Sequence, residues 1–120
     1  MRDLIQPIVK KESLKEEIKL LEQQLKPFGI KLETLADEGP KHQDTRKRAI
    51  SLSHRIQKHQ FILMKMYEKF RLPIRMFSTE FHVTEKFIKR SKKSIITVVI
   101  ILDKNYQTLL EWIGGDSNDL

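Results

Sequence analysis

The chain has 120 residues, 39% of them hydrophobic, which is enough for one domain with a modest core. It contains no cysteine, which excludes disulfides and thiolate metal sites, and its net charge of +7 favours an anionic partner. Residues 1–11 lack the apolar core of a signal peptide, and the longest apolar run, residues 95–102, is too short to span a bilayer. We therefore expect one soluble, cytoplasmic domain, whose start is compatible with a natural N-terminus or with a cut from a longer chain.

Only four glycines and four prolines interrupt the chain, which favours long helices. Ser13-Leu14-Lys15-Glu16 is a capping box followed by apolar residues at helical spacing, so we expect a helix to begin there, after a flexible lead over residues 1–12, and to end before Pro27. Further helices are expected over residues 31–37, 41–59, 61–70 and 106–113, before a frayed tail over residues 114–120. The helical domain would thus cover residues 13–113. Residues expected on its buried helix faces include Ala49, Ile56, Ile62, Met66, Phe70, Leu109 and Trp112.

The segment from Leu72 to Arg90 has the pattern of a helix-turn-helix. Residues 74–81 form its expected first helix, with Pro73 at the first helical position, where a missing N–H costs nothing. Ser78 is small, which allows the second helix to approach closely. Val83 is the expected apolar plug of the turn, and Thr84 the N-cap of the second helix.

The second helix is expected to be long. Residues 95–102 are rich in β-branched side chains and by themselves favour a buried strand. However, no glycine or proline interrupts residues 84–102, and one helical stripe runs through them: Ile88, Ser91, Ile95, Val98 and Leu102. We therefore predict an all-α fold, a compact multi-helix domain with a C-terminal helix-turn-helix over residues 74–102 and a long recognition helix.

The outward face of this helix is basic. With Ile88 facing inward, Lys86, Arg90 and Thr97 point outward, as a helix entering the major groove requires. Arg90 could donate two hydrogen bonds to guanine, whereas Phe87 either touches a thymine methyl group or packs on the preceding helix. Solvated basic faces are common, so this pattern favours DNA binding without establishing it. The predicted DNA-binding residues are Arg75, Thr84, Lys86, Phe87, Lys89, Arg90 and Lys93.

Catalysis finds little support in the sequence. The four histidines lack metal-ligand spacing, and no glycine-rich phosphate loop occurs. Ser51 and Ser53 lie near His54, but they are more typical of helix-surface or packing residues than of a nucleophile system. We expect a protein that is not an enzyme and that uses no metal and no cofactor.

Two blocks of residues together form a pattern that occurs in a known protein family. Pro40-Lys41-His42-Gln43-Asp44-Thr45-Arg46 precedes the helix-turn-helix, which itself contains Leu72-Pro73-Ile74 and, over residues 83–90, Val-Thr-Glu-Lys-Phe-Ile-Lys-Arg. Together these blocks resemble the C-terminal half of sigma-I factors, the heat- and polysaccharide-responsive alternative sigma factors of Bacillus and Clostridium relatives. The resemblance covers residues 18–113. Lys86 and Arg90 match the family pattern, but Glu85, Phe87 and Lys89 do not, and His82 stands where the family usually has glycine.

The resemblance implies a monomeric, region-4-like domain that recognises the minus-35 promoter element for the RNA polymerase core. It also implies control by the cytoplasmic N-terminal domain of a membrane-anchored anti-sigma factor. Two other functions stay open from the sequence: an autonomous helix-turn-helix repressor, which should dimerise, and a helical protein-interaction module without a DNA role. The sequence indicates neither the preferred promoter nor the inducing signal.

Overall fold

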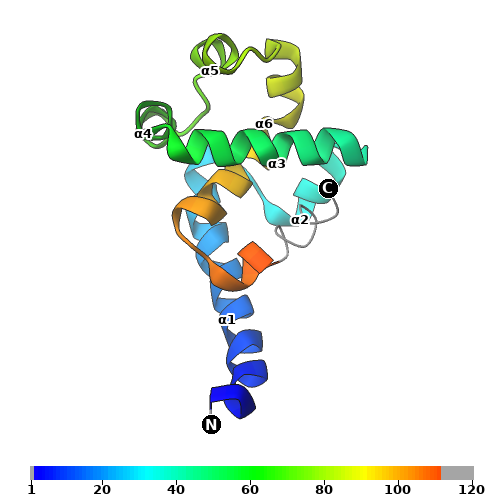
Figure 1. The fold of residues 1–120 in the computed structure, drawn as a ribbon, viewed down its shortest axis with the longest axis vertical. Helices are drawn as coiled ribbons and strands as arrows, with labels where there is room; N and C mark the ends of the chain where they lie inside the picture. The colour runs from blue at the N-terminus through cyan, green and yellow to red at the C-terminus, as the bar shows by residue number, and fades with distance from the viewer. Residues whose placement is uncertain (1, 112–120) are drawn as a thin grey trace.

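The computed structural model describes the backbone of residues 2–111 and the side chains of residues 13–35 and 37–111. The helices are α1 (Arg2–Leu25), the short 3-10 helix η1 (Lys26–Phe28), α2 (Leu32–Glu38), α3 (Gln43–Lys58), α4 (Gln60–Lys69), α5 (Ile74–Phe81) and α6 (Glu85–Asp103). Residues 107–111 are also helical. Residues 2–111 contain no strand, which confirms the all-α prediction (Figure 1).

Helix α3 crosses the middle of the molecule and packs most extensively against α6 (Figure 1). Two buried serines lie on these two helices, Ser53 on α3 and Ser91 on α6, with 0% and 1% of their surface exposed. The Ser53 hydroxyl donates to the Ala49 carbonyl at 2.8 Å and lies 3.4 Å from the Ile95 carbonyl oxygen of α6. Small side chains at this crossing let the two backbones approach closely, so the serines set how α6 sits on α3.

Burial explains why α6 remains helical through its β-branched residues. Helices α1, α2, α3 and α5 all contact α6, so apolar side chains are buried around most of its circumference. Ile88, Ile95, Val99 and Ile100 are fully buried, and the predicted continuation of the helix through residues 95–102 is confirmed. Tertiary burial outweighs the lower helix propensity of valine and isoleucine.

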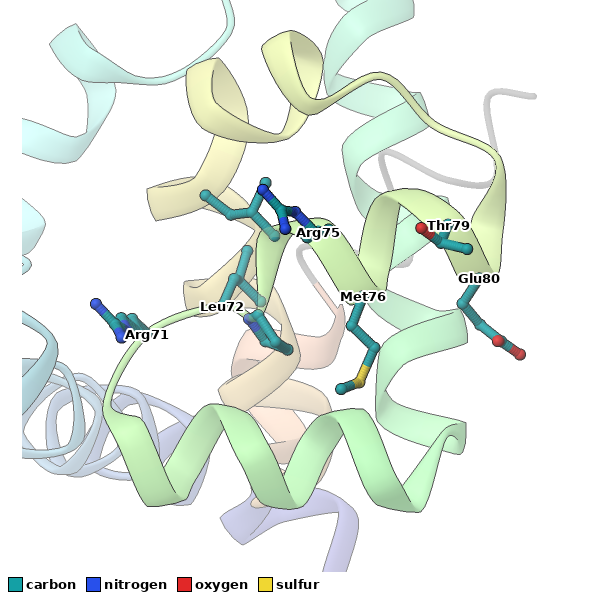
Figure 2. Close-up of a pocket in the computed structure, with 8 residues that line it drawn as sticks. Arg71, Leu72, Arg75, Met76, Thr79 and Glu80 are labelled. Atoms are coloured by element: carbon teal, nitrogen blue, oxygen red, sulfur yellow. The ribbon is translucent and has the colours of Figure 1, made fainter.

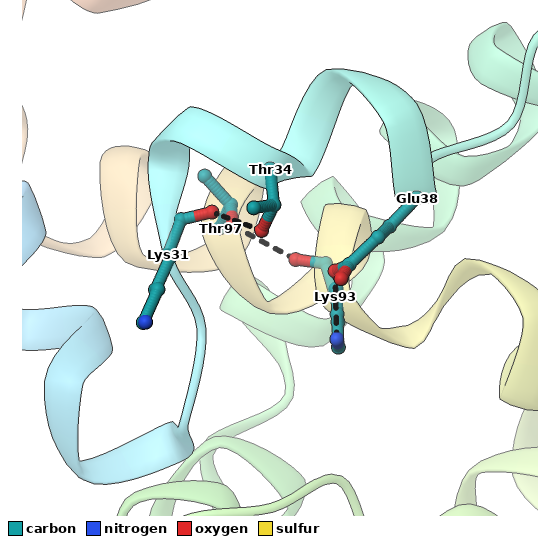
Figure 3. Close-up of polar contacts among 5 residues, drawn as sticks. All are labelled: Lys31, Thr34, Glu38, Lys93 and Thr97. Atoms are coloured by element: carbon teal, nitrogen blue, oxygen red, sulfur yellow. Dashed lines mark hydrogen bonds and ion pairs between the residues drawn. The ribbon is translucent and has the colours of Figure 1, made fainter.

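The predicted phase of α6 is wrong in its C-terminal half. Thr97, expected to point outward, is buried, and its hydroxyl donates to the Lys93 carbonyl at 2.8 Å. The reason is that α2 lies along this side of α6 (Figure 3). Val98 and Leu102, expected in the core, are only half-buried.

Three predicted boundaries also differ from the structure. Helix α1 begins at Arg2, so the Ser13–Glu16 pattern lies inside a helix and does not start one. Pro73 is the N-cap of α5 and not its first residue. Phe70 ends α4 in the left-handed conformation, with φ of 53°, and is therefore half exposed instead of continuing the buried face. Residues 112–120, including Trp112, lie outside the described residues, and flexible ends remain a prediction.

Hydrogen bonds to side chains of α1 and α4 hold the segment after α6 and the end of α6 itself. The Glu17 carboxylate of α1 accepts hydrogen bonds from the backbone N–H groups of Thr108 and Leu109, at 3.2 and 3.0 Å. The Tyr67 hydroxyl of α4 donates to the Asp103 carboxylate at 2.9 Å, at the end of α6. Burial of the phenol and its bond to Asp103 raise the pKa of Tyr67, so the hydroxyl stays protonated and keeps donating.

The two serines of the α3–α6 interface give a matched test of this packing. Ser53→Ala is expected to lower the free energy of unfolding by about 1 kcal/mol, because it removes a buried hydrogen-bonded donor. Ser91→Ala should leave the stability unchanged or raise it, since the Ser91 hydroxyl is buried without a hydrogen-bond partner. Urea unfolding of both variants measures the difference. Equal losses would show that the Ser53 hydrogen bond contributes nothing beyond packing.

Candidate nucleic-acid interface

Helices α5 and α6 form the predicted helix-turn-helix, and the turn between them is tightly held. Val83 is 6% exposed and plugs the turn as expected. The Ser78 hydroxyl donates to the Val83 carbonyl, while the Val83 N–H donates back to the Ser78 carbonyl at 3.2 Å. Thr84 is the N-cap of α6, because its hydroxyl accepts the Phe87 N–H at 3.2 Å. These contacts fix the angle at which α6 leaves the turn.

His82 takes the backbone conformation that glycine favours. Its φ and ψ of 55° and 48° lie in the left-handed region, and its N–H caps α5 by donating to the Ser78 carbonyl. The turn therefore keeps its shape despite the departure from the family pattern, at the cost of backbone strain in a residue with a Cβ atom.

Replacement of this histidine tests the strain directly. His82→Gly is expected to raise the free energy of unfolding by about 0.5–1 kcal/mol, since relief of left-handed strain exceeds the extra entropy of an unfolded glycine. His82→Ala is the control, because alanine keeps the strain while also removing the imidazole. Thermal unfolding compares the three proteins. A glycine variant no more stable than the alanine variant would contradict this account.

Aromatic packing seats α5 against the α3–α4 junction. Phe77 is fully buried, and the Phe81 ring meets it edge-on at 5.2 Å between centroids. The Arg55 guanidinium lies 4.6 Å over the Phe81 ring. His59 joins two helices, because its Nδ1 accepts the Ile62 N–H that begins α4 and its Nε2 lies 3.4 Å from the Glu80 carboxylate. The helix-turn-helix is thus anchored to the rest of the core.

The structure brings three predicted cations of α6 together on its exposed face. Lys86, Lys89 and Arg90 are exposed, and within residues 13–111 none of them forms an ion pair. Lys93 differs, because its ammonium group lies 2.7 Å from the Glu38 carboxylate of α2 (Figure 3). Lys93 stays a predicted DNA contact, but Glu38 already neutralises much of its charge. The freely available positive charge is therefore concentrated in the first half of α6.

The remaining predicted contacts occupy different environments. Thr84 is exposed at the start of α6, and Arg75 is exposed on α5 (Figure 2). Phe87 is half-buried beneath the Arg48 guanidinium of α3, 4.5 Å from its ring centre. Phe87 therefore packs against α3. It is not fully exposed to solvent, and its packing is not limited to the preceding helix.

Apolar surface is also exposed on α4, at its C-cap and on α5. Four large side chains are between 37% and 58% exposed: Phe61, Met64, Phe70 and Met76. A cavity of about 740 Å³ is lined by residues 71–76, Thr79 and Glu80, and Met76 points from α5 toward α4 (Figure 2).

Comparison with known proteins identifies the family. No protein-family model matches the chain. RNA polymerase sigma factor SigI of Bacillus subtilis is 31% identical over 107 residues, which cover 89% of this chain and 43% of that protein. SigI of Bacillus anthracis is 34% identical over 105 residues, and SigI4 of Acetivibrio thermocellus is 39% identical over 89 residues.

The chain is homologous to sigma-I family RNA polymerase sigma factors. It spans 43% of the Bacillus subtilis sigma-I factor and 44% of the Bacillus anthracis one, so it corresponds to less than half of each relative. The predicted resemblance to the sigma-I family is confirmed. Sigma factors are not enzymes, which agrees with the prediction of a non-enzymatic protein.

No group of histidines and carboxylates within the described residues could hold a metal ion. Among the same residues, no helix is long and apolar enough to cross a membrane.

The sequence does not indicate which residues face α6 from the connection after α2 and from α3. Pro40, Lys41 and His42 line a groove with the first half of α6, together with Arg48. In the sequence, the block of residues 40–46 indicates only the resemblance to the sigma-I family. A basic pattern at Lys41, Arg46, Lys47 and Arg48 was visible there, but nothing in the sequence showed that this segment meets the recognition helix.

Proposed function

We propose that this chain is the promoter-recognition domain of a sigma-I factor, corresponding to the C-terminal part of its relatives, and that it reads the minus-35 element for RNA polymerase. The observation that supports this most directly is the exposed first half of α6. It follows a capped turn and carries Lys86, Lys89 and Arg90 without ion-pair partners among the described residues.

The geometry suits major-groove reading. In a helix-turn-helix, side chains near the start of the second helix reach base edges while the first helix lies across the backbone. Arg90 carries the planar guanidinium that can donate two hydrogen bonds to one guanine, and Lys86 lies a turn closer to the helix start. Arg75 on α5 is placed to contact phosphate and to set orientation.

The variant that tests base reading is Arg90→Ala. A preferred duplex is first selected from a randomised library, and affinity is then measured at a fixed, stated salt concentration. Arg90→Ala is expected to cost about 1–3 kcal/mol on that duplex and to relax preference at one position. Lys92→Ala is the control and should cost less, because Lys92 is exposed on the same helix but lies two residues from Arg90, on nearly the opposite side. Equal losses on selected and scrambled duplexes would indicate a phosphate-binding surface that does not read bases.

The proposed setting of the domain is a cytoplasmic holoenzyme. Tethering to the RNA polymerase core supplies a high effective concentration at the promoter, so the isolated domain needs only weak affinity for DNA and can act as a monomer. The proposed regulator is the cytoplasmic N-terminal domain of a membrane-anchored anti-sigma factor. It would cover either the basic face of α6 or the apolar surface formed by Phe61, Met64, Phe70 and Met76.

A titration separates these two modes of regulation. The anti-sigma cytoplasmic domain is added to this chain bound to a labelled selected duplex. We expect a one-to-one complex that releases the DNA, because a partner that covers the basic face would compete directly with the duplex. A stable ternary complex would reject masking, and loss of that complex in Met76→Ser and Phe61→Ser variants would place the partner on the apolar surface.

Two further outcomes concern the proposed function itself. A tight dimeric DNA complex without anti-sigma binding would indicate a repressor. Anti-sigma or other protein binding without any DNA affinity would indicate a protein-interaction module, which the exposed apolar surface favours as the second candidate.

A further inference from the structure

A groove of about 660 Å³ separates the first half of α6 from the start of α3. One wall carries Lys41, His42 and Arg48, from the connection after α2 and from α3. The other wall carries Thr84, Lys86 and Arg90 of α6. Cations that are 38 to 49 residues apart in the sequence therefore face the same space. The groove continues the basic face of the recognition helix onto a second element.

The acidic side chain at the edge of this groove is neutralised. Glu38 lines the groove, but its carboxylate lies 2.7 Å from the Lys93 ammonium group. Arg48 lies over the Phe87 ring and keeps its fixed positive charge at the wall. The net charge that an occupant would meet is therefore positive, which favours an anion.

The floor of the groove is polar in one further respect. Ser91 lines the groove and is buried, and its hydroxyl has no hydrogen-bond partner. Helix α3 also begins without a side-chain cap, so its first backbone N–H groups have no side-chain acceptor. The uncapped N–H groups favour an occupant with oxygen acceptors over an apolar side chain, whereas the Ser91 hydroxyl is too buried to reach an occupant.

We infer that this groove binds the sugar-phosphate backbone of promoter DNA, with Lys41, His42 and Arg48 as a second contact element beside the helix-turn-helix. The inference rests on the proposed function, because it requires α6 to lie in the major groove. A helix in that groove, about 12 Å wide, has a phosphate strand on each side. In Figure 1 the start of α6 lies between α5 and the N-terminal end of α3. Arg75 thus faces one strand, and the groove faces the other.

These residues would position the domain and would not read sequence. Phosphate contacts fix register and orientation on the duplex, whereas base edges carry the sequence information. Loss of Lys41 or Arg48 should therefore weaken binding to every duplex alike, unlike loss of Arg90. Affinity measurements on different duplexes can therefore distinguish the role of the groove residues from that of Arg90.

The test uses the full chain and a short duplex of mixed sequence, because phosphate binding needs no known promoter. Affinity is measured by fluorescence anisotropy over a range of salt concentrations for wild type, Lys41→Ala, Arg48→Gln and Lys58→Ala. Each groove variant is expected to reduce the slope of log affinity against log salt by about 1, the value for one lost phosphate contact. Lys58, exposed at the far end of α3 and outside the groove, is the matched control and should leave the slope unchanged.

A second measurement keeps the proposal independent of variant stability. In a nuclear magnetic resonance titration of the wild-type chain with the same duplex, backbone amides of residues 41–45 should shift together with those of residues 85–90. Shifts in residues 85–90 alone, with unchanged salt slopes, would overturn the groove proposal and leave the promoter-recognition function standing. Shifts in neither segment would overturn both proposals. Slope changes for Lys58→Ala equal to those of the groove variants would also overturn the groove proposal, by showing diffuse attraction to the whole surface.

The competing occupant is an acidic side chain of a protein partner. If residues 41–45 respond to an acidic anti-sigma domain but not to the duplex, the DNA assignment of the groove is wrong.

Discussion

The contact between α3 and α6 is the constraint on which the rest of the structure depends. Helix α6 supplies both the exposed basic face and much of the core, so its rotation about its own axis decides which side chains would reach DNA in the proposed function. Ser53 and Ser91 keep the crossing close, and the fully buried Ile88 and Ile95 lock that rotation. Because interiors are close-packed, turning α6 by one residue would expose these isoleucines and bury the cations. The core therefore orients the recognition face without touching it.

The helix-turn-helix was predictable because its signals are local. Thr84 caps α6, Val83 plugs the turn, and the stripe through Ile88 and Ser91 faces inward, all as the sequence indicates. The β-branched run at residues 95–102 is also helical, as predicted, because no glycine or proline interrupts residues 84–102; the stripe that predicted it fails at Val98 and Leu102, which are only half-buried. Short-range capping and periodicity carry this information, and both can be read from residues within one or two helical turns.

The errors arise where a distant segment changes the environment. Thr97 was placed outward because a helical wheel contains only α6, whereas α2 covers that side in the folded chain. Ser13 begins a good capping pattern, but α1 already runs through it from Arg2. The groove beside α6 was invisible for the same reason: Lys41 and Lys86 are neighbours only once α3 has packed on α6.

Net charge does not by itself define a binding site; neighbours decide which cations remain available. Lys93 lies one helical turn beyond Lys89, yet the Glu38 carboxylate holds it against α2, whereas Lys89 has no such partner within the described residues. Arg48 keeps its charge but is held on the Phe87 ring, so its direction is fixed at little entropic cost on binding. Packing between α2, α3 and α6 thus converts a scattered excess of basic residues into a directed positive face. The basic residues of this face differ in setting: Arg90 extends from the exposed side of α6, whereas Arg48 is held at the wall of the groove.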